Sequence, residues 1–137
     1  MPSIVTAIPA ADSAAARAHF AAALSFETDC WDVRHSLAAA DFVLIDVRGA
    51  EAYARGHVPG AVHIPHGELT EARLRPYPAG TQFVLYCAGP HCNGAHRGAL
   101  RLAQLGRAVK IMLGGISGWR EEGYALEPAA TARTAAI

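Results

Sequence analysis

Four runs of apolar residues recur along the chain, and each is continuous rather than alternating with polar positions. They cover residues 42–48 (FVLIDVR), 61–64 (AVHI), 83–86 (FVLY) and 108–113 (AVKIML). Continuous runs of this length are typical of strands covered on both faces, as in a parallel sheet. A fifth, shorter strand is expected at the start of the segment SFETD, from residue 25.

The segments between these runs carry helix signals. Residues 11–23 are rich in alanine, the strongest helix former, and Asp12 or Ser13 stands in place to cap this helix. A second helix is expected after Thr28 or Asp29. It would bury Trp31, Val33 and Leu37. Further helices are predicted at 50–55, at 93–105 before the stop signal Gly106, and within 114–126.

Because strands and helices alternate, the sequence predicts an α/β fold. We expect a central, mainly parallel sheet of about five strands with helices on both faces, plus an extra N-terminal helix. The predicted organisation is a helical extension at 1–24, a single domain at 25–127 and a flexible tail at 128–137. A chain of 137 residues can bury enough surface to fold without a disulfide or a metal.

Charge and cysteine content narrow the expected partners. Lys and Arg total 12 and Asp and Glu total 12, so the chain lacks the basic excess typical of proteins that bind nucleic acid or anionic membranes. No apolar run approaches the ~20 residues of a membrane span. Three cysteines are an odd number and a poor disulfide framework. These features favour a reducing, cytoplasmic setting, with neither nucleic acid nor membrane as a partner.

The candidate chemistry lies where the apolar run 83–86 stops at Cys87. The residues that follow form a tight loop before the helix at 93–105: Ala88, Gly89, Pro90, His91, Cys92 and Asn93. In open α/β sheets, functional groups gather beyond the carboxyl ends of strands. Free loop amides and a helix N-terminus lower the pKa of a nearby thiol and so favour the nucleophilic thiolate. Cys87 is therefore a candidate nucleophile. The alternative is a small buried residue at a strand end.

Three ordered motifs give the chain a family resemblance, over roughly residues 26–126. They are LIDVRGAEAYARGHVPGAVHIP, then FVLYC with its loop and helix, and finally MLGGISGWREEGY. In these motifs the chain resembles the rhodanese-like (sulfurtransferase) domain family, as a single-domain member with a Cys-Ala-Gly-Pro-His-Cys-Asn-Gly loop. The resemblance implies a three-layer fold built around the parallel sheet.

The same resemblance implies an activity. Cys87 would take a sulfane sulfur from a small donor such as thiosulfate and pass it from a persulfide to cyanide or a thiol. The loop amides would stabilise the negative persulfide. No cofactor is implied. Asp46 and Arg48, at the end of the run 42–48, would support the site, mainly as an ion pair that fixes the next loop and otherwise by shaping the field of the pocket.

The loop departs from the family pattern at two positions. Cys92 and Asn93 stand where active members often carry an arginine and then a serine. Arg97 lies one helical turn farther along. A missing guanidinium weakens recognition of a dianionic donor. Phosphatase-like relatives of the fold need an arginine at the end of the loop, so that activity is disfavoured.

Cys92 has three interpretations. It is either a resolving thiol that attacks a modified Cys87, or a structural residue of the first helical turn. The third is a zinc site made by Cys87, Cys92, His91 and His96, whose spacing matches no familiar motif; we expect no metal. The alternative to the enzyme is a non-enzymatic sulfur-carrier, thiol-redox or partner-binding module that uses the Cys87/Cys92 pair, with a protein partner that the sequence does not name.

Overall fold

The computed structural model describes residues 1–129. Its strands are β1 (Glu27–Asp29), β2 (Val43–Asp46), β3 (Val62–His63), β4 (Gln82–Tyr86) and β5 (Ala108–Leu113). Its α-helices are α1 (Ile4–Ala7), α2 (Ser13–Phe26), α3 (Cys30–Ser36), α4 (Ala50–Arg55), α5 (Glu71–Leu74), α6 (Gly94–Gln104) and α7 (Gly115–Glu121). Two 3₁₀ turns, η1 (Leu37–Ala39) and η2 (His66–Glu68), complete the description.

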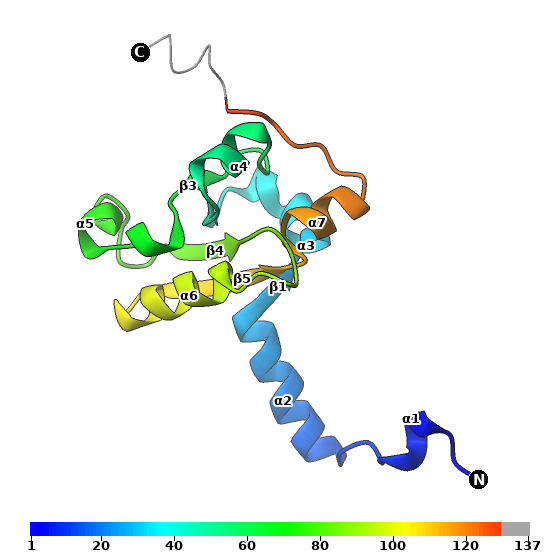
Figure 1. The fold of residues 1–137 in the computed structure, drawn as a ribbon. Coiled ribbons are helices and arrows are strands. Elements are labelled where there is room, and N and C mark those ends of the chain that lie inside the picture. Colours follow the sequence, from blue (N-terminus) through cyan, green and yellow to red (C-terminus); the bar gives the residue numbers. More distant parts are fainter. Residues whose placement is uncertain (130–137) are drawn as a thin grey trace.

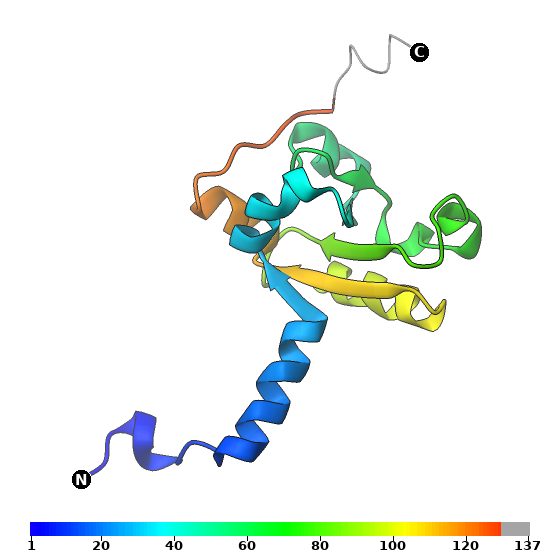
Figure 2. The ribbon, with the colours of Figure 1, turned by 180° about the vertical axis from the view of Figure 1, so that it is seen from behind.

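The five strands form one parallel sheet in the order β1-β5-β4-β2-β3. Helices α3, α4 and α7 lie over one face, and α5 and α6 lie over the other (Figures 1 and 2). The α/β class, the parallel sheet of five strands and the added N-terminal helix are thus confirmed. The strand order places β4 in the centre of the sheet, and β4 is the strand that leads into Cys87.

Successive apolar residues in the central strands β2 and β4 supply both cores. Leu44, Val84 and Tyr86 face the core beneath α3 and α7, where Trp119 is fully buried. The intervening positions face the second core beneath α5 and α6: Ile45, Val47, Phe83 and Leu85. Successive side chains of a strand point to opposite faces. A run without polar positions therefore follows directly from burial on both faces.

The prediction for Trp31 was wrong. Its side chain is 54% exposed and stacks on His35, with ring centroids 3.8 Å apart. The helix itself begins as expected, because Asp29 accepts a hydrogen bond from the backbone N–H of Asp32. Helix α3 turns Cys30 and Val33 into the core, and a residue next to Cys30 lies about 100° farther round the helix. Trp31 therefore points to solvent.

Other boundaries differ by small amounts. The first long helix extends to Phe26, and the strands expected at 42–48 and 61–64 are shorter. The helix α1, the helix α5 and the two 3₁₀ turns were missed, since segments of three or four residues carry no periodic pattern. The domain limits remain a prediction. Most of the tail expected at 128–137 lies outside the described residues.

The N-terminal extension projects away from the sheet (Figures 1 and 2). Helix α2 is capped by Asp12, whose side chain accepts from the N–H of Ala15, and it contains no buried residue. Its two phenylalanines, Phe20 and Phe26, are 63% and 65% exposed. The extension therefore makes little contact with the domain in a single copy of the chain.

Candidate active site

Cys87 lies at the carboxyl end of β4, and its position is fixed by α7. The carbonyl oxygen of Cys87 accepts a hydrogen bond from the N–H of Ile116 at 3.1 Å, and that of Ala88 accepts from the N–H of Ser117 at 2.9 Å. Gly115 makes this approach feasible. Its φ is +56°, and a Cβ at this position would overlap the carbonyl oxygen of Cys87. Gly115 thus lets α7 begin against the base of the loop.

The loop curls so that its two cysteines meet. The N–H of Cys92 donates to the carbonyl of Gly89 at 3.1 Å, which closes a turn. Cys87 and Cys92 are joined as a disulfide with a Cα–Cα distance of 6.4 Å. Gly94 leaves the space for both sulfurs, since a Cβ there would lie 2.9 Å from the Sγ of Cys87 and 3.6 Å from the Sγ of Cys92.

The Cys87 sulfur lies beside the N-terminus of α6. The first N–H groups of a helix have no partner within it and carry partial positive charge. No side chain caps this end: the N-cap residue, Asn93, instead accepts a hydrogen bond from the Nε of Arg97 at 3.1 Å. The first turn of α6 is therefore available to stabilise a thiolate or persulfide on Cys87.

A cavity of about 380 Å³ opens beside the disulfide. Its polar lining comes from Arg48, His66, Asn93 and Arg97, and its floor includes Cys87 and Cys92. On the other side of the same cysteines a smaller hollow of about 50 Å³ reaches His96. The lining of the larger cavity thus includes both cysteines and two arginines, Arg48 and Arg97.

A buried charge network lies behind the site. Asp46 is fully buried and accepts hydrogen bonds from the N–H, the Nε and the Nη2 of Arg48 at 2.9, 3.0 and 2.7 Å. It also accepts one from the hydroxyl of Tyr86 at 2.7 Å. The Tyr86 oxygen accepts from the N–H of Val58, and Arg48 donates to the carbonyl of Gly56. The network joins β2, β4 and the turn after α4.

The pKa values of Arg48 and Tyr86 are both raised, as this network of hydrogen bonds around a buried carboxylate leads one to expect. Burial lowers the pKa of Arg48, but the hydrogen bonds and charge of Asp46 outweigh it, and the net pKa is raised. Desolvation, followed by the charge of Asp46, raises the pKa of Tyr86 well above its ordinary value. Both groups therefore keep their protons near neutral pH. Their role is to satisfy a buried carboxylate.

Some of the predicted site residues lie together in the structure, and others do not. Cys87, Arg48 and the loop residues 88–90, 92 and 93 line the two cavities at the cysteines. His91 is exposed and lines neither of them. The side chain of Asp46 is fully buried and is paired with Arg48. The four side chains of the zinc alternative do not come together: residues 1–129 hold no group of three or more His, Cys, Asp or Glu placed to bind a metal ion.

The structure shows the surroundings of two residues outside the loop, Arg97 and Cys30. Arg97, one helical turn beyond the place of the missing arginine, lines the cavity, and its spacing of four residues from Asn93 is the signal for their contact. Cys30 is the third cysteine and lies outside the loop. It is buried, and burial followed by the charge of Asp29 raises its pKa to about 11. A thiol with so high a pKa is a poor nucleophile near neutral pH.

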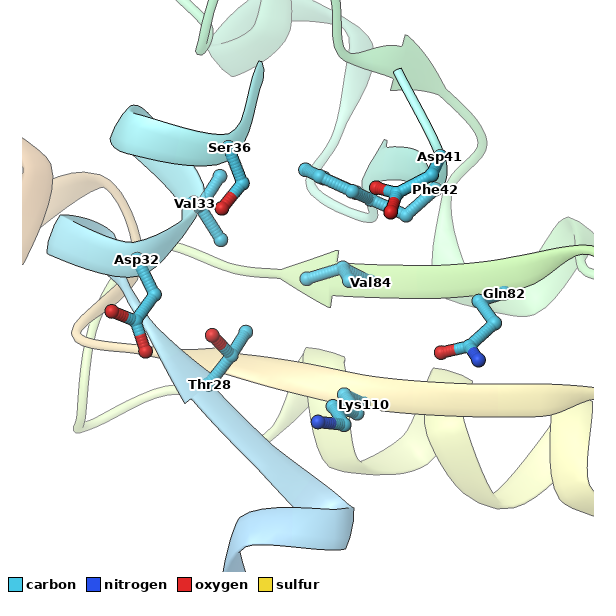
Figure 3. A pocket seen from close by; sticks show the side chains of 9 residues that line it. All are labelled: Thr28, Asp32, Val33, Ser36, Asp41, Phe42, Gln82, Val84 and Lys110. Atoms are coloured by element: carbon cyan, nitrogen blue, oxygen red, sulfur yellow. The ribbon is translucent and has the colours of Figure 1, made fainter. Parts of the chain in front are cut away.

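A separate cavity of about 220 Å³ lies on the α3 side of the sheet (Figure 3). Thr28, Asp32, Asp41, Gln82 and Lys110 point their polar groups toward it. It shares no lining residue with the cavity at the cysteines.

Among residues 1–129, no helix combines the length and apolar character that a bilayer crossing requires.

Comparison with known proteins gives one family. A model of the rhodanese-like domain matches residues 29–122. The HTH-type transcriptional regulator Rv0324 of Mycobacterium tuberculosis is 39% identical over 93 residues, which are 67% of this chain and 40% of the regulator. This chain therefore spans well under half of that relative's length.

Two solved structures show the same fold. The BH2092 protein of Bacillus halodurans is 31% identical with a TM-score of 0.82, and the match covers 92% of this chain and all of that one. Residues 27–137 are 111 of 137, or 81%, so this match includes part of the N-terminal extension. A thiosulfate sulfurtransferase of Pseudomonas aeruginosa has a TM-score of 0.69 at 24% identity, over 81% of this chain and 22% of that protein.

Replacing Arg48 tests the buried network. Arg48→Ala leaves the carboxylate of Asp46 buried without its cation, so we expect a loss of about 3–5 kcal/mol in the free energy of unfolding. The matched control is Arg73→Ala, which breaks a pair with Glu68 whose side chains are 45% and 61% exposed; its loss should stay below about 1 kcal/mol. Urea denaturation measures both. Equal losses would contradict the assigned role of Asp46.

Proposed function

Because the chain belongs to the rhodanese-like domain family, we propose that it is a sulfurtransferase that carries a sulfane sulfur as a persulfide on Cys87. The donor is a small anion such as thiosulfate, and the acceptor is cyanide or a thiol. The reaction needs neither a metal nor an organic cofactor. We further propose a reducing, cytoplasmic setting in which neither nucleic acid nor a membrane is a partner.

The observation that carries this proposal is the place of Cys87. Its sulfur lies at the end of a central strand, beside the uncapped N-terminus of α6 and on the floor of an open cavity. The Cys87 thiolate attacks the outer sulfur of thiosulfate, and sulfite leaves with the electron pair of the broken S–S bond. Cyanide then attacks the outer sulfur of the persulfide. Thiocyanate forms and the Cys87 thiolate is regenerated.

Arg97 is the residue we propose to hold the donor. The family's loop arginine is replaced by Cys92, but the guanidinium of Arg97 lines the same cavity, and only its Nε is engaged with Asn93. Its remaining N–H groups can donate to a sulfonate. Arg48 lines the cavity as well, but it is held by Asp46. We therefore expect weaker recognition of thiosulfate than a loop arginine would give.

A second candidate is a non-enzymatic sulfur carrier, thiol-redox or partner-binding module. It is favoured by the disulfide between Cys87 and Cys92 and by the relationship to a transcriptional regulator. In that role Cys87 would take up sulfur or be oxidised without rapid turnover, and a protein partner would read its state.

The proposed activity is tested with the reduced chain, thiosulfate and cyanide. Reduction comes first, since Cys87 is bound to Cys92 in the disulfide state. We expect thiocyanate to form catalytically and Cys87→Ser to lower the rate to that of the solution without protein. Cys30→Ser is the matched control, because Cys30 is a buried cysteine outside the site, and it should turn over like the parent chain.

Two results would contradict the proposal. Thiocyanate formation by Cys87→Ser at the parent rate would remove Cys87 from the chemistry. A parent chain that takes up one sulfur on Cys87 but forms no thiocyanate would reject the enzyme and favour the carrier.

A further inference from the structure

The role of Cys92 can be taken further, on the premise that Cys87 carries a persulfide. We propose that Cys92 attacks the inner sulfur of that persulfide, so that the protein releases sulfide and ends as the Cys87–Cys92 disulfide. The chain would then convert a sulfane sulfur to sulfide when no external acceptor reaches the cavity.

Geometry favours the inner sulfur as the target. Disulfides form between residues whose Cα atoms are about 4.4–6.8 Å apart, and those of Cys87 and Cys92 are 6.4 Å apart. The turn closed by Cys92 N–H and the carbonyl of Gly89 holds the loop in this curl. The contact joins Cys92 to the Sγ of Cys87 itself, which is the inner atom of the persulfide. Gly94 keeps the space beside both sulfurs open.

The step balances without an outside oxidant. The Cys92 thiol gives its proton to the outer sulfur of the persulfide anion. The resulting thiolate forms a bond to the Sγ of Cys87, and the bond between that Sγ and the outer sulfur breaks. The outer sulfur leaves as hydrosulfide with the electron pair. It is thereby reduced from sulfane sulfur to sulfide, while the two cysteines are oxidised to the disulfide. Thiol–disulfide exchange is faster when the conjugate acid of the leaving group has a low pKa, and hydrogen sulfide, the conjugate acid of hydrosulfide, is more acidic than an alkyl thiol.

The disulfide makes a dithiol reductant the second substrate. Cys87 is only 7% exposed, whereas Cys92 is partly exposed beside the open cavity. A reductant therefore attacks the sulfur of Cys92 and releases Cys87 first. A second thiol of the reductant then frees Cys92. The complete cycle consumes one sulfane sulfur and one dithiol, and it yields sulfide and a disulfide.

The test loads the reduced full-length chain with thiosulfate, and in a parallel sample with inorganic polysulfide, under anaerobic conditions without added thiol or cyanide. We expect the parent chain to release one equivalent of sulfide and to lose the mass of two hydrogens. Cys92→Ser should instead keep the mass of one added sulfur and release no sulfide. Cys30→Ser is the matched control and should behave as the parent chain does.

The outcomes separate this inference from the proposed function. A parent chain that holds the added sulfur as durably as Cys92→Ser overturns the sulfide-releasing step and leaves the sulfurtransferase intact. Disulfide formation without sulfide release also overturns it. If neither donor places sulfur on Cys87, both the inference and the proposed function are wrong.

An independent observation concerns the extension at residues 1–26. Six large apolar side chains there are 63–95% exposed: Ile4, Val5, Ile8, Phe20, Leu24 and Phe26. Helix α2 contains seven alanines and a single charged residue, Arg17. A helix that is apolar on all sides is normally buried. We infer that the extension packs against the extension of a second copy of this chain.

Area and charge favour a second copy. One partner of a standard interface buries about 800 Å², and six large apolar side chains that are 63–95% exposed present an apolar area on the order of that share. The extension carries one acidic side chain, Asp12, and one basic side chain, Arg17. Two copies therefore do not repel each other, and the surface offers no excess charge to an ionic partner. Alanine side chains also let two helices approach closely.

Sedimentation equilibrium of the full chain tests this pairing. We expect a dimer at micromolar concentration and a monomer for the double variant Phe20→Gln, Leu24→Gln, which keeps good helix formers. Leu100→Gln is the matched control: Leu100 is 61% exposed on α6, and this variant should remain dimeric. A parent chain that stays monomeric overturns the inference. A monomer that sediments with phosphatidylcholine vesicles would also overturn it and assign the helix to a lipid surface.

Discussion

The buried carboxylate of Asp46 is the constraint on which the site depends. A charge without solvent is costly unless it is paired and hydrogen-bonded, and Asp46 receives both from Arg48 and from the hydroxyl of Tyr86. Asp46 ends β2 and Tyr86 ends β4, so satisfying one charge fixes the ends of two neighbouring strands. Cys87 follows Tyr86 directly, so the backbone position of Cys87 is set by the end of β4.

Close backbone approach then shapes the reactive loop. Gly115 lets α7 donate hydrogen bonds to the loop carbonyls, and Gly94 leaves room for sulfur at the start of α6. The same compactness has a chemical consequence. A second thiol in the curled loop, Cys92, lies within bonding reach of Cys87. In the proposed chemistry, sulfur transfer to an outside acceptor and release as sulfide would therefore compete for one persulfide.

The features that depend on local sequence pattern could be predicted from the sequence. The apolar run before Cys87 indicated a central strand, and the motif around Asp46 and Arg48 indicated the ion pair behind the site. The prediction failed for Trp31, because its orientation depends on the rotation of a short helix. The contribution of Arg97 to the cavity depends likewise on how α6 is turned. The meeting of the two cysteines depends on the curl of the loop, which spacing leaves open.

Locating the transferred sulfur tests the central claim most directly. After brief exposure of Cys92→Ser to thiosulfate, fragmentation of the peptide that spans the loop would assign the added sulfur to one residue. The account predicts that the sulfur is on Cys87 and that cyanide removes it. Sulfur found on Cys30, or a chain that carries none after exposure to thiosulfate and to polysulfide, would contradict the account.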